Sequence, residues 1–486
     1  MIFSFAANAG ATRTGTLTIA GQTLTITQAG TTYVATTNVT TLVSSGLNQP
    51  DGIAVDNAGN VFIADTFNNA IKEWSAASNT VTTLVSSGLV QPFGVAVDSV
   101  GNVFLADLGH NAIKQWSAAS GAVSTLVSSG LFSPDGVAVD SAGNVYIADT
   151  FQNQIKEWLT ASNAITTLVS SGLNKPGGVA VDIAGNVYIA DTFNSAIKEW
   201  SPASNTVTTL VSSGLSFPYG AAVNGAGHVF IAGNSQDVIK EWSPAGNTVN
   251  TLVSSGLSYP EAVAVDSAGN LHIADSFGGS PFTNAILELP HAFVDPTAKT
   301  ETPAAGSDVL PVVLPATANL TGPFAPASDS SWLAITGVTN GVVSFAFTAN
   351  ATTTNRAAHI TLLGQTISVI QASVTPPILT GCATLGNGRF QFEFTNYQGA
   401  TFTVLTATNL LLPLTNWTVL GAPANNGSGL YQFTDPSATN AGQRFYRVSS
   451  PYDNMGSPIV WVASCDGLSK HWQFEGGKNS VAGMPR

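Results

Sequence analysis

Two positions of a repeated segment hold the side chains that could do chemistry in this chain. Both positions recur at a constant step of 42 residues, and at both the residue type changes from copy to copy. The first position holds carboxylates and aromatic rings: Asp51, Phe93, Asp135, Gly177, Tyr219 and Glu261. The second holds mainly amides and one imidazole: Asn68, His110, Gln152, Asn194, Gln236 and Gly278. Because rings stack and carboxylates accept hydroxyl or amide hydrogens, this mixture predicts a surface that binds a sugar or a peptide.

Two alternatives for these positions stay open. Loops vary freely as well as carrying function, so neutral drift explains the same variation. Three carboxylates, Asp51, Asp135 and Glu261, would supply oxygen ligands for Ca²⁺ if they converged. They belong to the first, third and sixth copies, so we expect them to be spread around a ring. Since carboxylates are often simply solvated, we expect no cofactor and keep calcium as the alternative.

An aspartate also recurs where the second apolar run of each copy ends. It occurs five times, at Asp65, Asp107, Asp149, Asp191 and Asp275. Catalysis needs one asymmetric set of residues, so this repetition indicates a turn-capping acceptor of backbone N–H groups. The six histidines have no metal or triad spacing, and no Gly-x-Ser-x-Gly occurs, so we predict no catalytic residues.

The elements that position these residues are short strands. Each copy contains four apolar runs separated by Gly, Asn, Asp and Ser. Runs such as 95–97 and 103–106 are too short for helices, and the Gly-Asn between them suits a hairpin. Four antiparallel strands in about 40 residues make one blade of a β-propeller, and runs apolar on both faces suit a blade between two neighbours.

Six copies predict six blades in a domain over 37–294. A lone copy of the fourth strand, 39–45, precedes the first unit, and the sixth unit has none of its own. We therefore expect strand 39–45 to complete the last blade, because an open edge needs closing. Strands alternate in direction, which places both variable positions on the same face of the disc, at the mouth of the central channel.

The unit resembles the NHL repeat, through Pro-x-Gly-Val-Ala-Val-Asp and Gly-Asn-Val-Tyr-Ile-Ala-Asp-Thr over residues 40–290. The resemblance implies a propeller used mostly as a binding or scaffolding platform. Some relatives with similar blades are lyases or lactone hydrolases that use a channel histidine and an acid. By position these would correspond to His110 and Glu261, which makes an enzyme the alternative.

Two flanking segments share a second pattern. Residues 1–30 contain Arg13-Thr-Gly-Thr-Leu-Thr-Ile and Gly21-Gln-Thr-Leu-Thr-Ile-Thr-Gln, and similar runs recur at 356–371 after extra strands that include Ser331-Trp-Leu-Ala-Ile-Thr. Both resemble the BACON domain, an immunoglobulin-like sandwich for which a carbohydrate-binding or spacer role has been suggested. We expect 1–30 to be the C-terminal half of such a sandwich and 303–373 a whole one. Alternation around Trp332 favours a core position over a sugar platform.

The rest of the chain is less regular. Residues 378–450 alternate as strands do and resemble a fibronectin-like module of exported bacterial proteins. Beyond Pro451 no period remains, and 451–486 is predicted to be an irregular tail. Cys382 and Cys465 could pair or stay separate, because their spacing matches no metal or redox motif.

Composition narrows the function further. Only 9% of residues are charged and the formal net charge is −13, so we do not expect the protein to bind nucleic acid. No run of 18 apolar residues is present, and no signal peptide is recognisable. We expect a fragment of a longer extracellular or cell-surface bacterial protein, monomeric, that binds a glycan or a protein without catalysis. Its predicted fold class is all-β: a six-bladed β-propeller followed by two β-sandwich domains.

Overall fold

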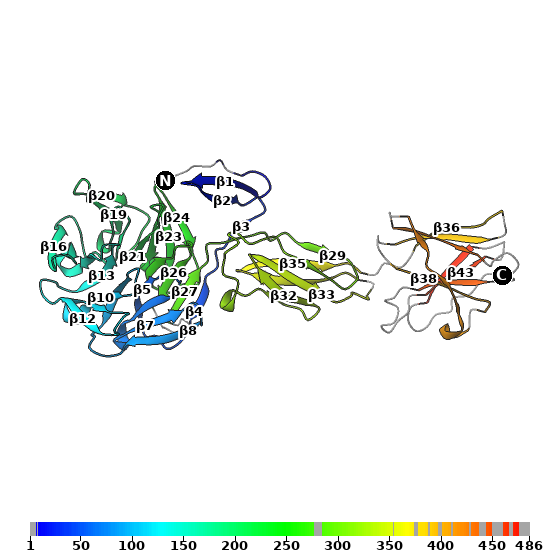
Figure 1. Ribbon diagram of the computed structural model, residues 1–486, viewed down its shortest axis with the longest axis horizontal. Helices are drawn as coiled ribbons and strands as arrows, with labels where there is room; N and C mark the ends of the chain where they lie inside the picture. Colours follow the sequence, from blue (N-terminus) through cyan, green and yellow to red (C-terminus); the bar gives the residue numbers. More distant parts are fainter. Residues whose placement is uncertain are drawn as a thin grey trace.

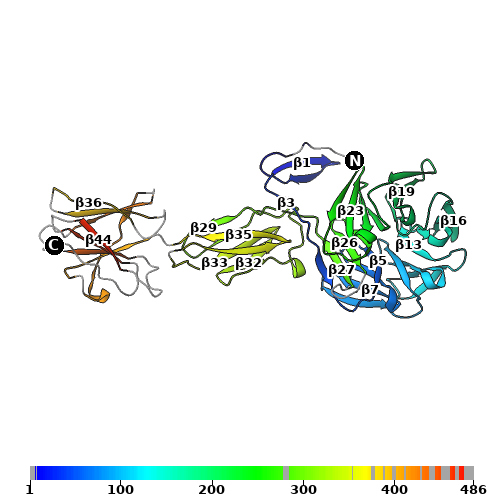
Figure 2. The ribbon, with the colours of Figure 1, turned by 180° about the vertical axis from the view of Figure 1, so that it is seen from behind.

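The computed structural model describes residues 6, 8–276, 284–352, 354–373, 378–386, 389–396, 401–409, 412–426, 429–436, 444–449, 460–465 and 470–475. The chain is all-β, with the propeller at one end, a β-sandwich in the middle and a second one at the C-terminal end (Figure 1). The N-terminal hairpin lies beside the propeller, as the view from behind also shows (Figure 2). The predicted fold class is confirmed.

The first three blades are four-stranded antiparallel sheets whose strands follow chain order. Blade one has β5 (Pro50–Val55), β6 (Val61–Asp65), β7 (Ala70–Ser75) and β8 (Thr80–Val85). Blade two has β9 (Pro92–Val97), β10 (Val103–Asp107), β11 (Ala112–Trp116) and β12 (Val123–Val127). Blade three has β13 (Pro134–Val139), β14 (Val145–Asp149), β15 (Gln154–Leu159) and β16 (Ala164–Val169).

The last three blades continue this order, and the sixth borrows its outer strand. Blade four has β17 (Val179–Val181), β18 (Val187–Asp191), β19 (Ala196–Ser201) and β20 (Thr206–Val211). Blade five has β21 (Pro218–Val223), β22 (Val229–Gly233), β23 (Val238–Ser243) and β24 (Thr248–Val253). Blade six has β25 (Pro260–Val265), β26 (Leu271–Asp275) and β27 (Ala285–Leu289), with β4 (Thr40–Val43) paired antiparallel to β27.

The innermost strands surround a narrow axis. Strands β5, β9, β13, β17, β21 and β25 contact one another in turn, and β25 contacts β5. A Cβ added to Gly52 would lie 2.0 Å from the carbonyl oxygen of Phe93, and one on Gly94 would lie 2.4 Å from that of Asp135. Glycine therefore allows neighbouring backbones to approach this closely. Second strands such as β6 are buried along their whole length, because blades cover both of their faces.

Two short strands join the propeller to the middle module. β3 (Val34–Ala35) lies just before the ring begins, and β28 (Phe293–Val294) lies just after it ends. The two pair antiparallel, and the backbone N–H of Thr36 donates to the carbonyl oxygen of Ala292 at 2.9 Å. The chain therefore enters and leaves the propeller at one place.

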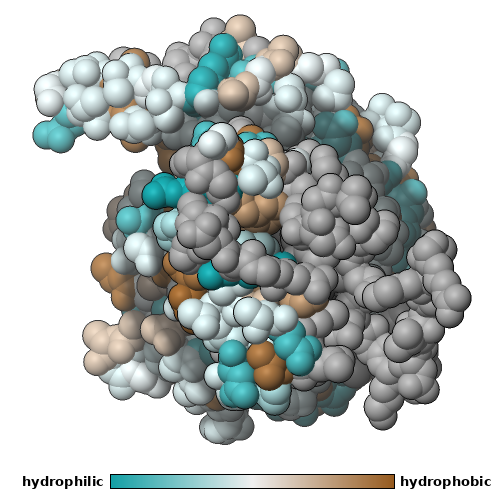
Figure 3. Space-filling view, turned by 90° about the vertical axis from the view of Figure 1, so that its right-hand side faces the viewer, coloured by the Kyte–Doolittle hydropathy of each residue, from teal (hydrophilic) through white to brown (hydrophobic). Residues whose placement is uncertain are grey.

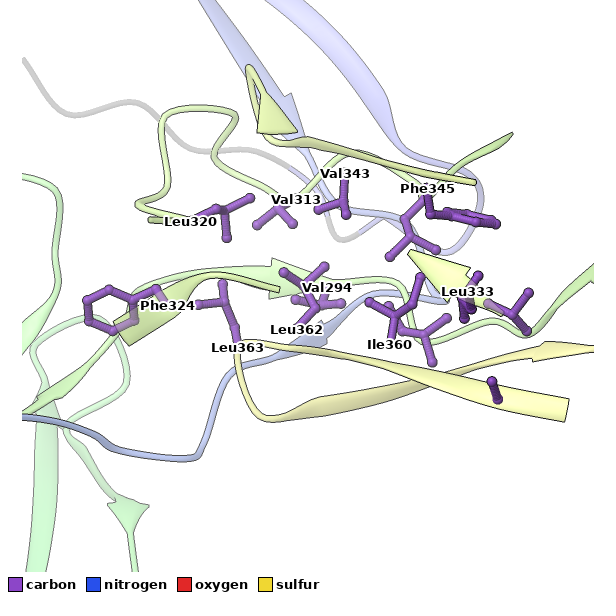
Figure 4. Packing of buried hydrophobic residues seen from close by; sticks show 14 of the residues in the cluster. Val294, Val313, Leu320, Phe324, Leu333, Val343, Phe345, Ile360, Leu362 and Leu363 are labelled. Atoms are coloured by element: carbon purple, nitrogen blue, oxygen red, sulfur yellow. The ribbon is translucent and has the colours of Figure 1, made fainter. Parts of the chain in front are cut away.

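The middle module consists of two packed sheets. One sheet holds β29 (Lys299–Glu301), β35 (Gln365–Gln371), β34 (Arg356–Leu362) and β31 (Ala327–Ser328). The other holds β30 (Gly306–Val309), β33 (Val342–Phe347) and β32 (Leu333–Thr339), with the 3₁₀ turn η6 (Gly322–Phe324) nearby. Side chains of the two sheets meet in one apolar layer (Figure 4). Trp332 packs against this core, and the Arg356 guanidinium lies 4.2 Å from its ring centre.

The C-terminal module also has two sheets, and it corrects one prediction. The first contains β36 (Ile378–Thr384), β37 (Phe390–Thr395), β41 (Leu430–Asp435) and β40 (Ala424–Asn425). The second contains β39 (Thr418–Gly421), β38 (Thr403–Ala407), β42 (Phe445–Ser449), β43 (Val460–Cys465) and β44 (Lys470–Glu475), with the 3₁₀ turn η7 (Leu414–Asn416) before β39. The expectation of an irregular tail was wrong for the last two strands, because each supplies the neighbouring strand edge with backbone partners. Whether Cys382 and Cys465 pair stays open, because their side chains lie outside the part of the chain that the structure describes.

The N-terminal hairpin repeats the polar links of the middle module without its core. β1 (Arg13–Ile19) pairs with β2 (Gln22–Gln28), and Arg13 Nε donates to Gln28 Oε1 at 2.8 Å, as Arg356 Nε does to Gln371 Oε1. Ile19 and Leu24 are 41% and 53% exposed, whereas their counterparts in β34 and β35 are buried. The apolar face of this hairpin is therefore left open.

The face seen from the C-terminal side has many weakly polar residues. Pale residues cover much of its coloured part, with separate hydrophilic and hydrophobic groups between them (Figure 3). This agrees with the small share of charged residues, because Thr, Ser and Gly have hydropathies near zero. Within the described part of the chain, no helix is long and apolar enough to cross a membrane.

Candidate functional site

The first variable position lies in the central channel. In five blades its residue follows the proline that begins the innermost strand, so the ring brings Asp51, Phe93, Asp135, Tyr219 and Glu261 together around the axis. They line a cavity of about 60 Å³, together with glycines of the same strands. That volume holds a few water molecules. A sugar or peptide could therefore touch this position only at its exposed rim.

The channel residues contact one another across the ring. The Tyr219 hydroxyl donates to Asp135 Oδ2 at 2.8 Å, although the two residues belong to blades five and three. Phe93, on the opposite side from Tyr219, has its ring centre 5.5 Å from that of Tyr219. Asn234 Nδ2 donates to Glu261 Oε1 at 2.6 Å. These contacts link side chains from four blades across the channel.

Burial makes the channel carboxyls weaker acids than carboxyls in water. It raises the pKa of Asp51 to about 7, that of Asp135 to about 6 and that of Glu261 to about 8. The charges of Asp51 and Asp135 raise the pKa of Glu261 further. These carboxylates lie on blades one, three and six, around the ring as expected, and the narrow axis brings them within electrostatic range of one another. Burial also raises the pKa of Tyr219.

The channel offers an incomplete set of metal ligands. Asp51 Oδ1 and Glu261 Oε2 are buried without a hydrogen-bond partner. Among the described residues, however, no group of three His, Cys, Asp or Glu side chains is arranged to hold a metal ion. Their raised pKa values favour the protonated form of the channel carboxyls. Protonation would remove the free-energy cost of burying negatively charged carboxylates.

The second variable position lies further out, on loops that follow the second strands. Among its described residues, four form polar contacts on these loops and do not line the channel cavity: Asn68, His110, Gln152 and Asn194. Asn68 and Asn194 donate to the aspartates three residues earlier, each at 2.8 Å, and His110 Nδ1 lies 2.7 Å from Asp107 Oδ2. Gln152 Nε2 donates to the Gly130 carbonyl oxygen at 3.3 Å. Because His110 is bound to Asp107, the structure does not bring it together with Glu261.

The recurring aspartate accepts a backbone N–H group in all five blades that have it, and in four of them it also pairs with a lysine. Asp65 Oδ1 accepts the backbone N–H of Asn48 at 2.6 Å, and its other oxygen lies 2.6 Å from Lys72 Nζ. Buried ion pairs of this kind recur between Lys114 and Asp107, Lys156 and Asp149, and Lys198 and Asp191. Blade six has leucine at the lysine position, and burial raises the pKa of Asp275 to about 7. The lysine partner was missed in the sequence, where it resembles an edge charge.

Sequence reasoning also missed an exposed row of aromatic side chains on the same face. Phe132 and Phe151 have ring centres 5.5 Å apart, and those of Phe193 and Phe217 lie 5.2 Å apart. Lys175 Nζ lies between the pairs, 5.0 Å from the Phe151 ring centre and 4.6 Å from that of Phe193. We call these five residues the aromatic arc. It crosses blades three, four and five.

The arc remains exposed despite its size. Its four phenylalanines are between 41% and 56% exposed. Lys175 and Phe217 also have left-handed backbone conformations, with φ of 47° each. A bulky side chain in this region costs free energy, and such costs often mark functional positions. Here all six copies share the conformation, and two of them have an aromatic residue there, Phe217 and Tyr259. The sequence signal that could have led to the arc is the presence of aromatic residues in the turn segments beside Gln152 and Asn194.

One family model matches part of the chain. Residues 325–372 match the family described as "BACON: Putative binding domain, N-terminal". The matched segment covers strands β31 to β35 of the middle module. Among curated proteins, none matches this chain significantly.

Some solved structures are similar to this chain at low sequence identity. A structural genomics protein from Bacteroides thetaiotaomicron is 17% identical, with a TM-score of 0.47, over 58% of this chain and 83% of that one. A gluconolactonase from Xanthomonas campestris is 16% identical, with a TM-score of 0.44, over 52% and 89%. A chain from the nidogen/laminin complex is 21% identical, with a TM-score of 0.39, over 42% and 80%.

Proposed function

We propose that this chain is a binding or scaffold protein that recognises a glycan or a protein through the aromatic arc. The arc is the observation that carries the proposal. It offers four half-exposed rings and one cation in a continuous row on loops of three blades. Aromatic residues are enriched where proteins bind partners, and exposed apolar groups that gather in one place mark such sites.

The channel supports binding rather than chemistry in this proposal. Its residues are buried or half-buried and enclose about 60 Å³, and Tyr219 is hydrogen-bonded to Asp135, which leaves little space for a substrate. The remaining modules would extend the propeller from a surface as spacers, or add a contact through the middle module. We also propose that the protein acts outside the cell as a monomer, since its surface carries few charges and many Thr and Ser residues.

The test compares the full chain with the double variant Phe151→Ala/Phe193→Ala on arrays of glycans and of extracellular proteins. We expect the wild type to bind at least one ligand and the variant to bind it at least tenfold more weakly, because aromatic anchors commonly contribute 1 kcal/mol or more, about tenfold or above, each. Phe67→Ala is the matched control, since Phe67 occupies the same repeat position in blade one and is 51% exposed.

Either of two results would contradict the proposal. One is equal binding by the wild type and the double variant. The other is an equal loss in the double variant and in Phe67→Ala, which would show a general effect of removing surface rings. Turnover of a ligand that depends on Glu261 would instead favour the enzyme alternative.

A further inference from the structure

A second cavity lies on the face of the propeller opposite the arc. It encloses about 800 Å³ and is far larger than the channel cavity. Its walls are the hairpin turns between first and second strands of blades five and six, with Asn57 of blade one at the edge. Its remaining wall is formed by Ala35, Thr36 and residues 290–293, where the chain enters and leaves the ring. Small-molecule sites commonly have volumes of about 300–1,000 Å³.

The repeated sequence of the hairpin turn differs in blade five, which lines this cavity. In five blades the hairpin turn has an aspartate and, four residues later, an asparagine whose Nδ2 donates to the aspartate, as Asn102 does to Asp98 at 2.8 Å. Blade five has Asn224 and His228 at these places. His228 turns away from Asn224 and its Nδ1 lies 2.7 Å from Glu241 Oε1. Both His228 and Glu241 line the cavity.

The pair presents one nitrogen to a ligand. A carboxylate accepts hydrogen bonds, so contact with Glu241 fixes the proton on Nδ1 of a neutral His228 and leaves Nε2 as an acceptor. Glu241 and His228 are 21% and 31% exposed, so the pair is reachable from the cavity. Apolar side chains complete the lining, among them Phe230, Leu252, Leu271, Leu289 and Phe293.

The acidic groups at this cavity already have partners, so it does not attract a cation strongly. Asp266 Oδ1 accepts two backbone N–H groups at 2.9 Å each, and its Oδ2 accepts Asn270 Nδ2 at 2.8 Å. Glu241 is engaged with His228. An anion would meet the negative charges of both carboxylates, so an uncharged ligand fits best.

We propose that this cavity is a binding site for a small neutral saccharide, with His228 Nε2 accepting a sugar hydroxyl and the apolar wall covering a sugar face. Acceptors beside apolar surface suit a ligand that is rich in hydroxyl donors and also has C–H faces. The site is separate from the arc, so it extends the proposed function and can succeed or fail independently of it.

The test uses the full chain and saturation-transfer NMR with glucose, galactose, N-acetylglucosamine, maltose and cellobiose, and with glucuronic acid as a charged counterpart of glucose. The double variant Asn224→Asp/His228→Asn rebuilds the turn that the other blades already use, so it should fold. The matched control Asp98→Asn/Asn102→His places the blade-five residues in blade two, away from the cavity.

We expect at least one neutral saccharide to bind the wild type, with glucuronic acid binding more weakly than glucose. The rebuilt turn should weaken that binding about tenfold or more, since a lost hydrogen bond in a partly buried site costs about that much. The blade-two control should bind within about twofold of the wild type. No binding of any neutral saccharide, equal binding by the rebuilt turn, an equal loss in the control, or tighter binding of glucuronic acid would each overturn the proposal.

Discussion

At the scale of the residue, three buried acids set how the propeller responds to pH. The folded protein raises the pKa values of Asp51, Asp135 and Glu261 to about 7, 6 and 8, while the unfolded chain keeps them near 4. Between these limits the folded state binds more protons than the unfolded state. The free energy of unfolding therefore falls as pH rises from about 4 to about 8. Asp275 and Glu288, with pKa values raised to about 7 by burial, add to the same trend.

Replacing two channel acids by amides should remove part of this dependence. Asp51→Asn/Glu261→Gln mimics the protonated acids, so we expect its melting temperature at pH 8.5 to exceed that of the wild type by at least about 2 °C, with little difference at pH 5. Calorimetry at the two pH values measures this. Asp308→Asn is the control, because Lys299 holds the pKa of Asp308 below its usual range. A wild-type melting temperature that does not fall between pH 5 and 8.5 would contradict the account.

At the scale of the element, the sequence predicted the strands and the closing of the ring by β4, but it missed the side-chain contacts between blades. The period of 42 and the turn residues were sufficient to predict blades, because each blade repeats the same local chemistry. The arc could not be predicted, since Lys175 meets Phe151 and Phe193 only through the angle between adjacent blades. The cavity beside His228 depends on segments that enter and leave the ring, which share no local pattern with blade five.

The close approach of the innermost strands makes a glycine substitution costly. Gly52→Ala would place a Cβ 2.0 Å from a backbone oxygen of the next blade, so we expect it to lower the free energy of unfolding by about 1–3 kcal/mol or more. Urea titration followed by tryptophan fluorescence measures the change. Gly225→Ala is the control, because a Cβ there meets no atom within 4 Å. Equal stability of the two variants would show that the strands move apart without cost.

Strand β4, which completes blade six, should be essential for the cooperative folding of the propeller. Without β4, the outer edge of β27 and the apolar side chains around Val43 would be exposed. We expect deletion of residues 37–46 to abolish cooperative thermal unfolding of the propeller, followed by circular dichroism, whereas deletion of residues 8–28 should leave that transition in place. A cooperative transition at the wild-type temperature after the first deletion would show that the ring closes by other means.

At the scale of the whole molecule, the propeller and the middle module share residues. Ala292 and Val294 follow the last propeller strand, yet they belong to the core of the sandwich. Leu42 lies in β4 and packs against that core and against the core between blades six and one. Tyr33 Oη donates to the Val312 carbonyl oxygen at 2.9 Å, which adds a link from the entering segment. The two bodies should therefore unfold together.

Leu42 provides the sharpest test of this coupling, because the repeat supplies its own control. Leu84 occupies the same place in the fourth strand of blade one, but it packs against only one core. We expect wild-type calorimetry to show one transition for the propeller and middle module. Leu42→Ala should separate it into two, because it weakens the core that joins them, while Leu84→Ala should lower the melting temperature of a single transition. If both variants keep one transition, the contacts that join the two bodies are mainly those of the β3–β28 pair and Tyr33. If the wild type already shows two transitions, the propeller and the middle module unfold independently, and the shared residues only connect them.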